Sequence, residues 1–226
     1  MSFFKDALSI FKKSELVFIE RVKESEKVYS FLFSKDQDLT WKPGQHGLFT
    51  ITHKKIKNGT KPFTVSSTPS EGEVRITTSI GDEPSEFKRA LMELEPGMKI
   101  SMSGPVGSFY LKEDSPALFI ATDIGITPFR AIIKQIEEEN IGKQFKLLYF
   151  NNENVHIYKE DFKNVDVDFI TTKEQLMHEI NAFTEKNKEN GQYFVAGSKE
   201  AVNTVVEHLK SNNIAKRNIK KDVFVG

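Results

Sequence analysis

Short runs of apolar, aromatic and β-branched residues follow one another along the first half of the chain. Several of them alternate apolar and polar positions, and Gly, Pro, Asn and Asp separate them, which is typical of short strands in a barrel or sandwich. The expected strands are Leu16–Ile19, Val28–Phe33, Gly47–Thr52, Phe63–Ser67, Glu73–Ile80 and Met98–Ser103. One segment with helical spacing, Ser85–Leu94, interrupts them. We therefore predict an antiparallel six-stranded β-barrel.

After about residue 115 the pattern changes to continuous apolar runs that alternate with helical segments. The expected strands are Ala117–Ala121, Lys146–Phe150, Val167–Thr171 and Tyr193–Ala196. The expected helices are Pro128–Glu139, Glu174–Glu185 and Lys199–Ser211. Apolar strands that alternate with helices indicate a parallel sheet covered on both faces. We predict a doubly wound α/β domain whose ligands bind at the carboxyl ends of its strands.

The two patterns together predict an α+β protein of two domains. We place the barrel domain at residues 1–113 and the α/β domain at residues 114–226, because the polar, proline-containing segment 114–116 separates them. Residues 1–13 fit a short helix with an apolar face. Packing of this helix on the protein body is favoured, and an anchor on an anionic membrane surface is the alternative. No apolar run approaches the roughly 20 residues that span a bilayer, so we expect no transmembrane segment.

Composition narrows the classes of function. The 32 basic and 32 acidic residues balance, so we expect no nucleic-acid partner. The chain has no cysteine, which excludes disulfides, thiolate zinc sites and Cys-ligated iron–sulfur clusters on it. Its five histidines show no ligand spacing, and we expect no metal site. We expect a cytoplasmic protein, with which the absence of cysteine is compatible.

A cation, an aromatic ring and hydroxyl groups open the fourth expected strand, at Lys61-Pro62-Phe63-Thr64. A flavin dinucleotide needs such a set. A cation can bind its diphosphate, an aromatic side chain can pack against its ring system, and a hydroxyl can hydrogen-bond a ring nitrogen. Ser85, directly before the expected helix, is a candidate N-cap at a helix start that suits phosphate. Taken singly, each segment is more often an ordinary strand or capped helix.

Two junctions between a strand, a glycine and a helix follow in the second half. Residues 121–128 join a buried strand to a helix, with Pro128 near its first turn. A pyrophosphate or nicotinamide binds at this place in a doubly wound sheet. The segment is not the Gly-x-Gly-x-x-Gly fingerprint, because Gly125 is its only glycine. Ala196-Gly197-Ser198 form the second junction, at the same expected edge of the sheet.

In this order the motifs resemble those of the ferredoxin–NADP reductase superfamily, in a stand-alone bacterial-type form. Lys61-Pro62-Phe63-Thr64 looks like a variant of its Arg-x-Tyr-Ser/Thr flavin motif, and residues 81–85 look like its Gly-x-x-Ser phosphate loop with one residue more. The family's Gly-Pro-x-Gly-x-Phe is matched by Gly104, Pro105, Gly107 and Phe109. Its Gly-Gly-x-Gly-x-Thr-Pro nucleotide loop is matched by Gly125, Thr127 and Pro128. Ala196-Gly197-Ser198 stands where the family has Cys-Gly-Pro.

The resemblance also implies the site residues. It implies two catalytic contacts to the flavin, from Thr64 and Phe224. The cofactor-binding residues that it implies are Lys61, Pro62, Phe63, Thr64, Thr78, Ser79, Ile80, Pro84, Ser85, Thr122, Asp123, Gly125, Thr127, Pro128 and Gly197.

Three departures from the family motifs affect the expected chemistry. Lys61 replaces Arg, and a point charge loses the bidentate geometry that Arg offers to phosphate. Asp123 replaces Gly, which brings a carboxylate and a Cβ toward an anionic dinucleotide. Ala196 replaces Cys near the expected nicotinamide.

The resemblance implies an FAD-dependent oxidoreductase that passes hydride from NAD(P)H to FAD and electrons on to an external acceptor. No Arg or Lys lies between Leu147 and Tyr158, where NADP-specific relatives bind the 2′-phosphate, so NADH is favoured over NADPH. The acceptor is expected to be a small redox protein or a small molecule such as a ferric chelate. Two alternatives remain open: a flavin-binding electron-transfer module that does not oxidise NAD(P)H, and a fold relative that has lost both cofactors.

Overall fold

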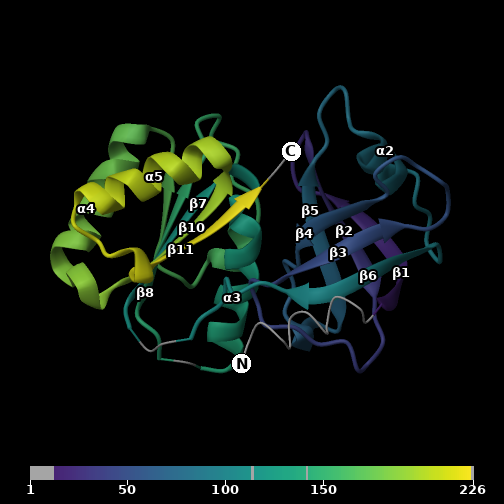
Figure 1. Cartoon of the computed structure of the whole chain (residues 1–226), viewed down its shortest axis with the longest axis horizontal. Coiled ribbons are helices and arrows are strands. Elements are labelled where there is room, and N and C mark those ends of the chain that lie inside the picture. Colours follow the sequence, from purple (N-terminus) through teal and green to yellow (C-terminus); the bar gives the residue numbers. More distant parts are fainter. Residues whose placement is uncertain (1–12, 113–114, 141, 225–226) are drawn as a thin grey trace. The chain divides into compact units, whose positions relative to one another are not determined.

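The structure is a computed structural model that describes residues 13–112, 115–140 and 142–224 (Figure 1). The chain divides between Tyr110 and Leu111 into two compact units, which we call the N-terminal and C-terminal units. The boundary that the sequence suggests, between residues 113 and 114, stays a prediction. Each unit is described by itself.

The N-terminal unit is a six-stranded antiparallel sheet with one helix. Its strands are β1 (Lys13–Lys23), β2 (Val28–Ser34), β3 (His46–Ile51), β4 (Thr60–Thr64), β5 (Glu73–Ser79) and β6 (Lys99–Val106), and its helix is α2 (Glu86–Met92). The strands pair in the order β4-β3-β6-β1-β2-β5. Beyond β4, the backbone N–H of Ser66 donates to the carbonyl of Arg75 in β5 at 2.8 Å, which links the two ends of this order. The predicted antiparallel, barrel-like sheet of six strands is confirmed.

Alternation of apolar residues explains the core of this sheet. In the pairing of β2 with β5, Phe31 lies opposite Ile76 and Phe33 opposite Val74, and all four side chains are fully buried. Because side chains alternate between the faces of a strand, the intervening residues point away from this core. Helix α2 adds Phe87, Ala90 and Leu91 to it.

The structure shifts one of the predicted elements of this unit, and a second lies outside the described residues. The fourth strand was expected at Phe63–Ser67, but β4 begins at Thr60 because Thr60 pairs with Thr50 of β3. The predicted strand thus extends past β4, where Ser67 hydrogen-bonds β5 through its side chain instead. The predicted N-terminal helix lies outside the described residues except for Lys13, which begins β1 and pairs with Ser103 of β6.

The C-terminal unit is a parallel sheet flanked by helices. Its five strands are β7 (Ala117–Thr122), β8 (Phe145–Phe150), β9 (Val167–Ile170), β10 (Gln192–Ser198) and β11 (Ile219–Phe224). They pair in the order β11-β10-β7-β8-β9, so the switch point of strand order lies between β7 and β10. The helices are α3 (Thr127–Glu138), α4 (Lys173–Asn187) and α5 (Lys199–Ser211). Short 3₁₀ helices occur at Pro69–Glu71, Asp123–Ile126, Lys159–Phe162, Lys188–Asn190 and Lys216–Asn218.

Both faces of the parallel sheet are covered, as the doubly wound prediction requires. Leu118 and Ile120 of β7 pack in one cluster with residues of α4 and α5. On the other face, Phe119 stacks on Phe129 of α3 with ring centroids 5.2 Å apart. Figure 1 shows α3 on one side of the strands and α4 with α5 on the other. No described helix of either unit is long and apolar enough to cross a bilayer.

One strand of the C-terminal unit escaped the sequence analysis. β11 contains the charged run Lys220-Lys221-Asp222, which hides its period of two. It is an edge strand, and its residues are half-buried or exposed. An edge strand can carry charges because one of its sides faces no neighbour.

Candidate cofactor sites

In the N-terminal unit, aromatic packing joins β4 to α2. The ring of Phe63 stacks on Phe87 of α2, with centroids 5.6 Å apart and an interplanar angle of 28°. Its other contact is an edge-on contact with Phe49 of β3, at 6.0 Å. Phe63 is half-buried as a result. The packing fixes the predicted flavin motif beside the start of α2.

The remaining residues of the flavin motif alternate along β4. Lys61 is half-buried, Pro62 is exposed and Thr64 is buried at 7% exposure. Lys61 and Phe63 share one face of the strand because they are two positions apart. A cation and a ring on one face are the two groups that a flavin dinucleotide needs from this motif.

The predicted residues that follow β4 lie on β5 and before α2. Thr78 and Ser79 end β5, which contacts β4, and the N–H of Ile80 donates to the carbonyl of Lys27 at 2.6 Å. Ser85 is the N-cap of α2, as predicted, and its hydroxyl accepts from the N–H of Lys88 at 3.4 Å. The carbonyl of Pro84 accepts from the guanidinium of Arg89 at 2.5 Å. The cap fixes the position of Lys88 relative to Ser85.

The Gly-Pro-x-Gly-x-Phe segment closes on the start of β3. A Cβ on Gly107, whose φ is +103°, would lie 2.9 Å from Nδ1 of His46. The side-chain amide of Gln45 donates to the Gly107 carbonyl at 3.1 Å. Position 107 therefore needs glycine both for its backbone conformation and for this close approach.

In the C-terminal unit, the segment after β7 meets the end of β10 at the switch point. A Cβ on Gly125 would overlap the backbone carbonyl of Ala196, and one on Gly197 would overlap Oγ1 of Thr122. Gly197 also has a φ of +151°. The structure thus brings together residues that the sequence places about 70 positions apart, and both segments depend on glycine for their contact.

Other predicted residues lie at the same edge. Thr127 and Pro128 begin α3, and Phe224 ends β11 opposite Ser198 of β10. Thr122 is 2% exposed, and its Oγ1 has no hydrogen-bond partner among the described residues. A buried hydroxyl without a partner is costly, so this oxygen suits a polar group of a ligand.

Asp123 departs from the family pattern, and its carboxylate is held by the loop after β8. It has a left-handed φ of +51°, and its Oδ1 accepts from Nδ2 of Asn151 at 2.8 Å. Partial burial raises the pKa of the Asp123 carboxyl, the Asn151 hydrogen bond acts against this, and the charge of Glu153 adds to the rise. Two like charges therefore lie near each other at the carboxyl edge of the sheet.

Asn151 is a site residue that the sequence analysis missed. Its Oδ1 accepts from the backbone N–H of Glu153 at 3.0 Å and of Val155 at 2.8 Å, while its Nδ2 binds Asp123. One side chain thus shapes the loop after β8 and ties it to the loop after β7. The available signal was an Asn directly after an apolar strand, where Asn commonly organises turns.

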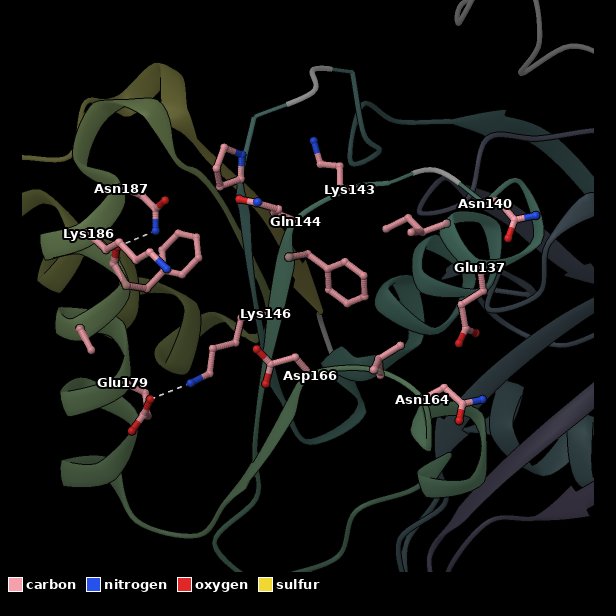
Figure 2. A pocket seen from close by; sticks show the side chains of 16 residues that line it. Glu137, Asn140, Lys143, Gln144, Lys146, Asn164, Asp166, Glu179, Lys186 and Asn187 are labelled. Atoms are coloured by element: carbon pink, nitrogen blue, oxygen red, sulfur yellow. Dashed lines mark hydrogen bonds and ion pairs between the residues drawn. The ribbon is translucent and has the colours of Figure 1, made fainter.

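The C-terminal unit has a cavity of about 820 Å³ at the opposite edge of its sheet, near the start of β8 and the ends of α3 and α4. Figure 2 shows Lys146 directed toward Glu179, to which its ammonium binds at 2.8 Å. Lys146 also pairs with Asp168 at 2.7 Å. None of the predicted site residues lines this cavity. Ligands of parallel sheets bind at the carboxyl ends of the strands, so we do not assign the cofactor sites to it.

A comparison with known families matches the N-terminal unit. Residues 13–110 match the family model described as "Oxidoreductase FAD-binding domain". This segment contains all six strands of the N-terminal unit.

Curated relatives include an electron transfer component and a component of a quinone reductase. The toluate 1,2-dioxygenase electron transfer component of Pseudomonas putida is 28% identical over 134 residues, which are 58% of this chain and 38% of that protein. One component of the Na(+)-translocating NADH-quinone reductase of Shewanella putrefaciens is 25% identical over 46% of this chain and 38% of that protein. The matches thus span about two fifths of these relatives.

A solved structure with the same fold is the ferredoxin-NADP+ reductase of Plasmodium falciparum. It superposes with a TM-score of 0.76, at 15% identity, over 93% of this chain and 95% of that one. The predicted fold class is therefore confirmed over both units.

Proposed function

We propose that the chain is an FAD-dependent oxidoreductase that oxidises NADH, because residues 13–110 match the oxidoreductase FAD-binding domain family and the chain has the ferredoxin–NADP reductase fold. Electrons would pass to an external acceptor. The observation that carries the proposal is the contact of the segment after β7 with the end of β10, which Gly125 and Gly197 allow, because ligands of doubly wound sheets bind at this switch point. The cytoplasmic location stays a prediction.

The residues of the N-terminal unit fit FAD. Lys61 forms no ion pair with a carboxylate among the described residues, so its ammonium is available to the diphosphate. Phe63 would contact the ring system, Thr64 would hydrogen-bond it, and Ser85 would position the phosphate loop. Pro62, Thr78, Ser79, Ile80 and Pro84 would supply the surrounding contacts. When bound, FAD supplies the chemistry of accepting hydride and releasing electrons.

The C-terminal unit would bind the nicotinamide nucleotide. The nucleotide would bind at the switch point, where Gly125 and Gly197 let the segment after β7 contact the end of β10. The hydroxyl of Thr122, which has no hydrogen-bond partner among the described residues, would hydrogen-bond it. Thr127 and Pro128 would form the adjoining start of α3. The contact of Phe224 with the flavin stays a prediction from the resemblance.

The loop after β8 supports NADH as the donor. Asp123 and Glu153 place two carboxylates at this edge, and no Arg or Lys lies between Leu147 and Tyr158. A carboxylate can accept a hydrogen bond from a ribose 2′-hydroxyl but repels a 2′-phosphate. These carboxylates therefore oppose the binding of NADPH more than that of NADH.

The acceptor is best sought among proteins. One relative is named as the electron transfer component of a dioxygenase, and we propose a protein acceptor of this kind for the present chain. A small molecule such as a ferric chelate is the alternative, and reduction assays with both classes would separate them.

An anaerobic absorbance scan tests the proposed function. The purified protein is supplied with FAD, and NADH or NADPH is then added. A flavin band near ~450 nm that bleaches faster with NADH is expected. Strong preference for NADPH would contradict the donor assignment, and a protein that stays colourless with FAD would contradict the function itself.

One observation favours a second candidate, an electron-transfer module that does not oxidise NAD(P)H. The carboxylate of Asp123 lies in the loop that would receive an anionic dinucleotide, and repulsion would weaken binding there. A flavin band that neither nucleotide bleaches would support this candidate.

A further inference from the structure

Two lysines lie on the elements that the Phe63–Phe87 stack holds together. Lys61 precedes Phe63 by two positions on the same face of β4, and Lys88 directly follows Phe87 in α2. Both lysine side chains are half-buried. The packing of β4 against α2 therefore brings Lys88 close enough to Lys61 for their charges to repel each other.

Neither lysine is neutralised by the protein. Among the described residues, no carboxylate forms an ion pair with Lys61 or Lys88. The acidic residue of α2, Glu86, and the acidic C-cap of this helix, Glu93, have other partners. Glu86 accepts from the backbone N–H of Lys57 at 3.0 Å, and Glu93 binds the ammonium of Lys54. Burial and then repulsion by Lys61 lower the pKa of Lys88.

The position of Lys61 and Lys88 relative to Thr64 indicates which anion the two lysines bind. Lys61 and Thr64 are three positions apart on β4, which corresponds to about 10 Å along a strand. The ribityl chain of FAD can bridge such a span between a ring held near Thr64 and a phosphate held near Lys61. An anion at the two lysines would also relieve the repulsion between them.

We propose that Lys88 binds the FAD diphosphate together with Lys61, so that two point charges from two elements take the place of one bidentate arginine. The proposal rests on the proposed function and adds a binding residue to it. It also gives a physical account of the replacement of Arg by Lys at position 61, since a second ammonium supplies the donors that a single lysine lacks.

The test compares FAD binding by four forms of the full chain. Apoprotein of the wild type, Lys88→Gln, Lys88→Arg and Lys99→Gln is titrated with FAD, and the dissociation constant is measured from flavin fluorescence at several KCl concentrations. Lys99→Gln is the matched control, because it removes the same charge from the same unit at an exposed pair with Glu15. Melting temperatures of the four apoproteins report on folding.

Lys88→Gln should weaken FAD binding about tenfold or more, which is the usual effect of losing one hydrogen bond to a charged group. Its affinity should also depend less on KCl, while Lys88→Arg and Lys99→Gln should bind as the wild type does. Equal affinity of Lys88→Gln and Lys99→Gln would overturn the role of Lys88 and leave the proposed function standing. A weakening that Lys88→Arg shares, or that follows a lower melting temperature, would also overturn it. A wild type that binds no FAD would instead overturn the proposed function.

Discussion

The two candidate sites are built in different ways. At the switch point of the C-terminal unit, the shape of the site comes from backbone atoms, since Gly125 and Gly197 leave no space for a Cβ. At the β4–α2 junction of the N-terminal unit, the site consists of side chains, since Lys61, Lys88 and Phe63 supply charge and a ring. A backbone site should fail abruptly when one methyl group is added. A side-chain site should weaken by degrees and respond to salt.

The largest expected effect is at the backbone site. Gly125→Ala places a methyl group against the backbone carbonyl of Ala196, which cannot move without disturbing β10. Overpacking of this kind costs about 1–3 kcal/mol or more. We expect a lower melting temperature of the C-terminal unit and loss of bleaching by NADH. Gly142→Ala is the control, because a Cβ there meets no atom within 4 Å. Equal melting temperatures of the two variants would show that the segment after β7 can move away from β10 without loss of stability.

A smaller effect is expected at Asn151, which connects the loop after β8 to the loop after β7. Asn151→Ala removes the hydrogen bond to Asp123 and two acceptor contacts to backbone N–H groups. Loss of such contacts costs about 1–3 kcal/mol where the groups stay buried, and less where water replaces Asn151. Hydrogen exchange of residues 151–155 should accelerate, and NADH should bind more weakly. Asn152→Ala changes an exposed neighbour and should alter neither measurement.

How far the sequence predicts these sites depends on the range of the interactions. Alternating or continuous apolar runs predict ten of the eleven strands that the described residues form, because burial on one or both faces of a sheet leaves a local pattern. β11 is missed because Lys220 to Asp222 break that pattern on an edge strand. Ser85 is found because an N-cap is a local feature.

The residues that sequence reasoning missed act across long separations. Asn151 binds Asp123 over 28 positions, and nothing in either segment alone indicates the contact. Lys88 lacks a signal for the same reason, because its relation to Lys61 depends on the stack of Phe63 on Phe87. The resemblance supplied the motif residues, but the packing between elements identified these two.

The proposed preference for NADH offers a sharper test of the carboxyl edge. Glu153→Arg replaces a repulsive charge by a cation that can bind a 2′-phosphate. The ratio of the NADPH to the NADH specificity constant, kcat/KM, should rise about tenfold, as the gain of one charge-assisted hydrogen bond implies. Glu137→Arg makes the same change at the opposite edge of the sheet and should leave the ratio unchanged. An unchanged ratio in both variants would show that the ribose of the nucleotide does not bind near Glu153.

The smallest expected effect is the pH dependence of nucleotide binding. Partial burial raises the pKa of Asp123, so the folded protein holds this proton at a higher pH than the unfolded chain does. This difference in pKa makes the stability of the folded state depend on pH. As pH rises from the ordinary pKa of an aspartate to the raised one, the unfolded chain loses its proton first, and the stability of the folded state falls. Over the same window NADH binding should weaken, because Asp123 becomes charged beside an anionic dinucleotide.

Asp123→Asn should remove this pH dependence and strengthen NADH binding at neutral pH by about fivefold, which corresponds to about 1 kcal/mol for one screened charge. The measurement is the dissociation constant of NADH as the pH rises from the ordinary pKa of an aspartate to neutral pH. Asp166→Asn, at the amino end of β9, is the control, since it lines the cavity at the opposite edge. His156 lies close enough to Asp123 to lower its pKa, and burial lowers the pKa of His156 itself. A pH dependence that persists in Asp123→Asn and disappears in His156→Gln would therefore assign the titration to the histidine.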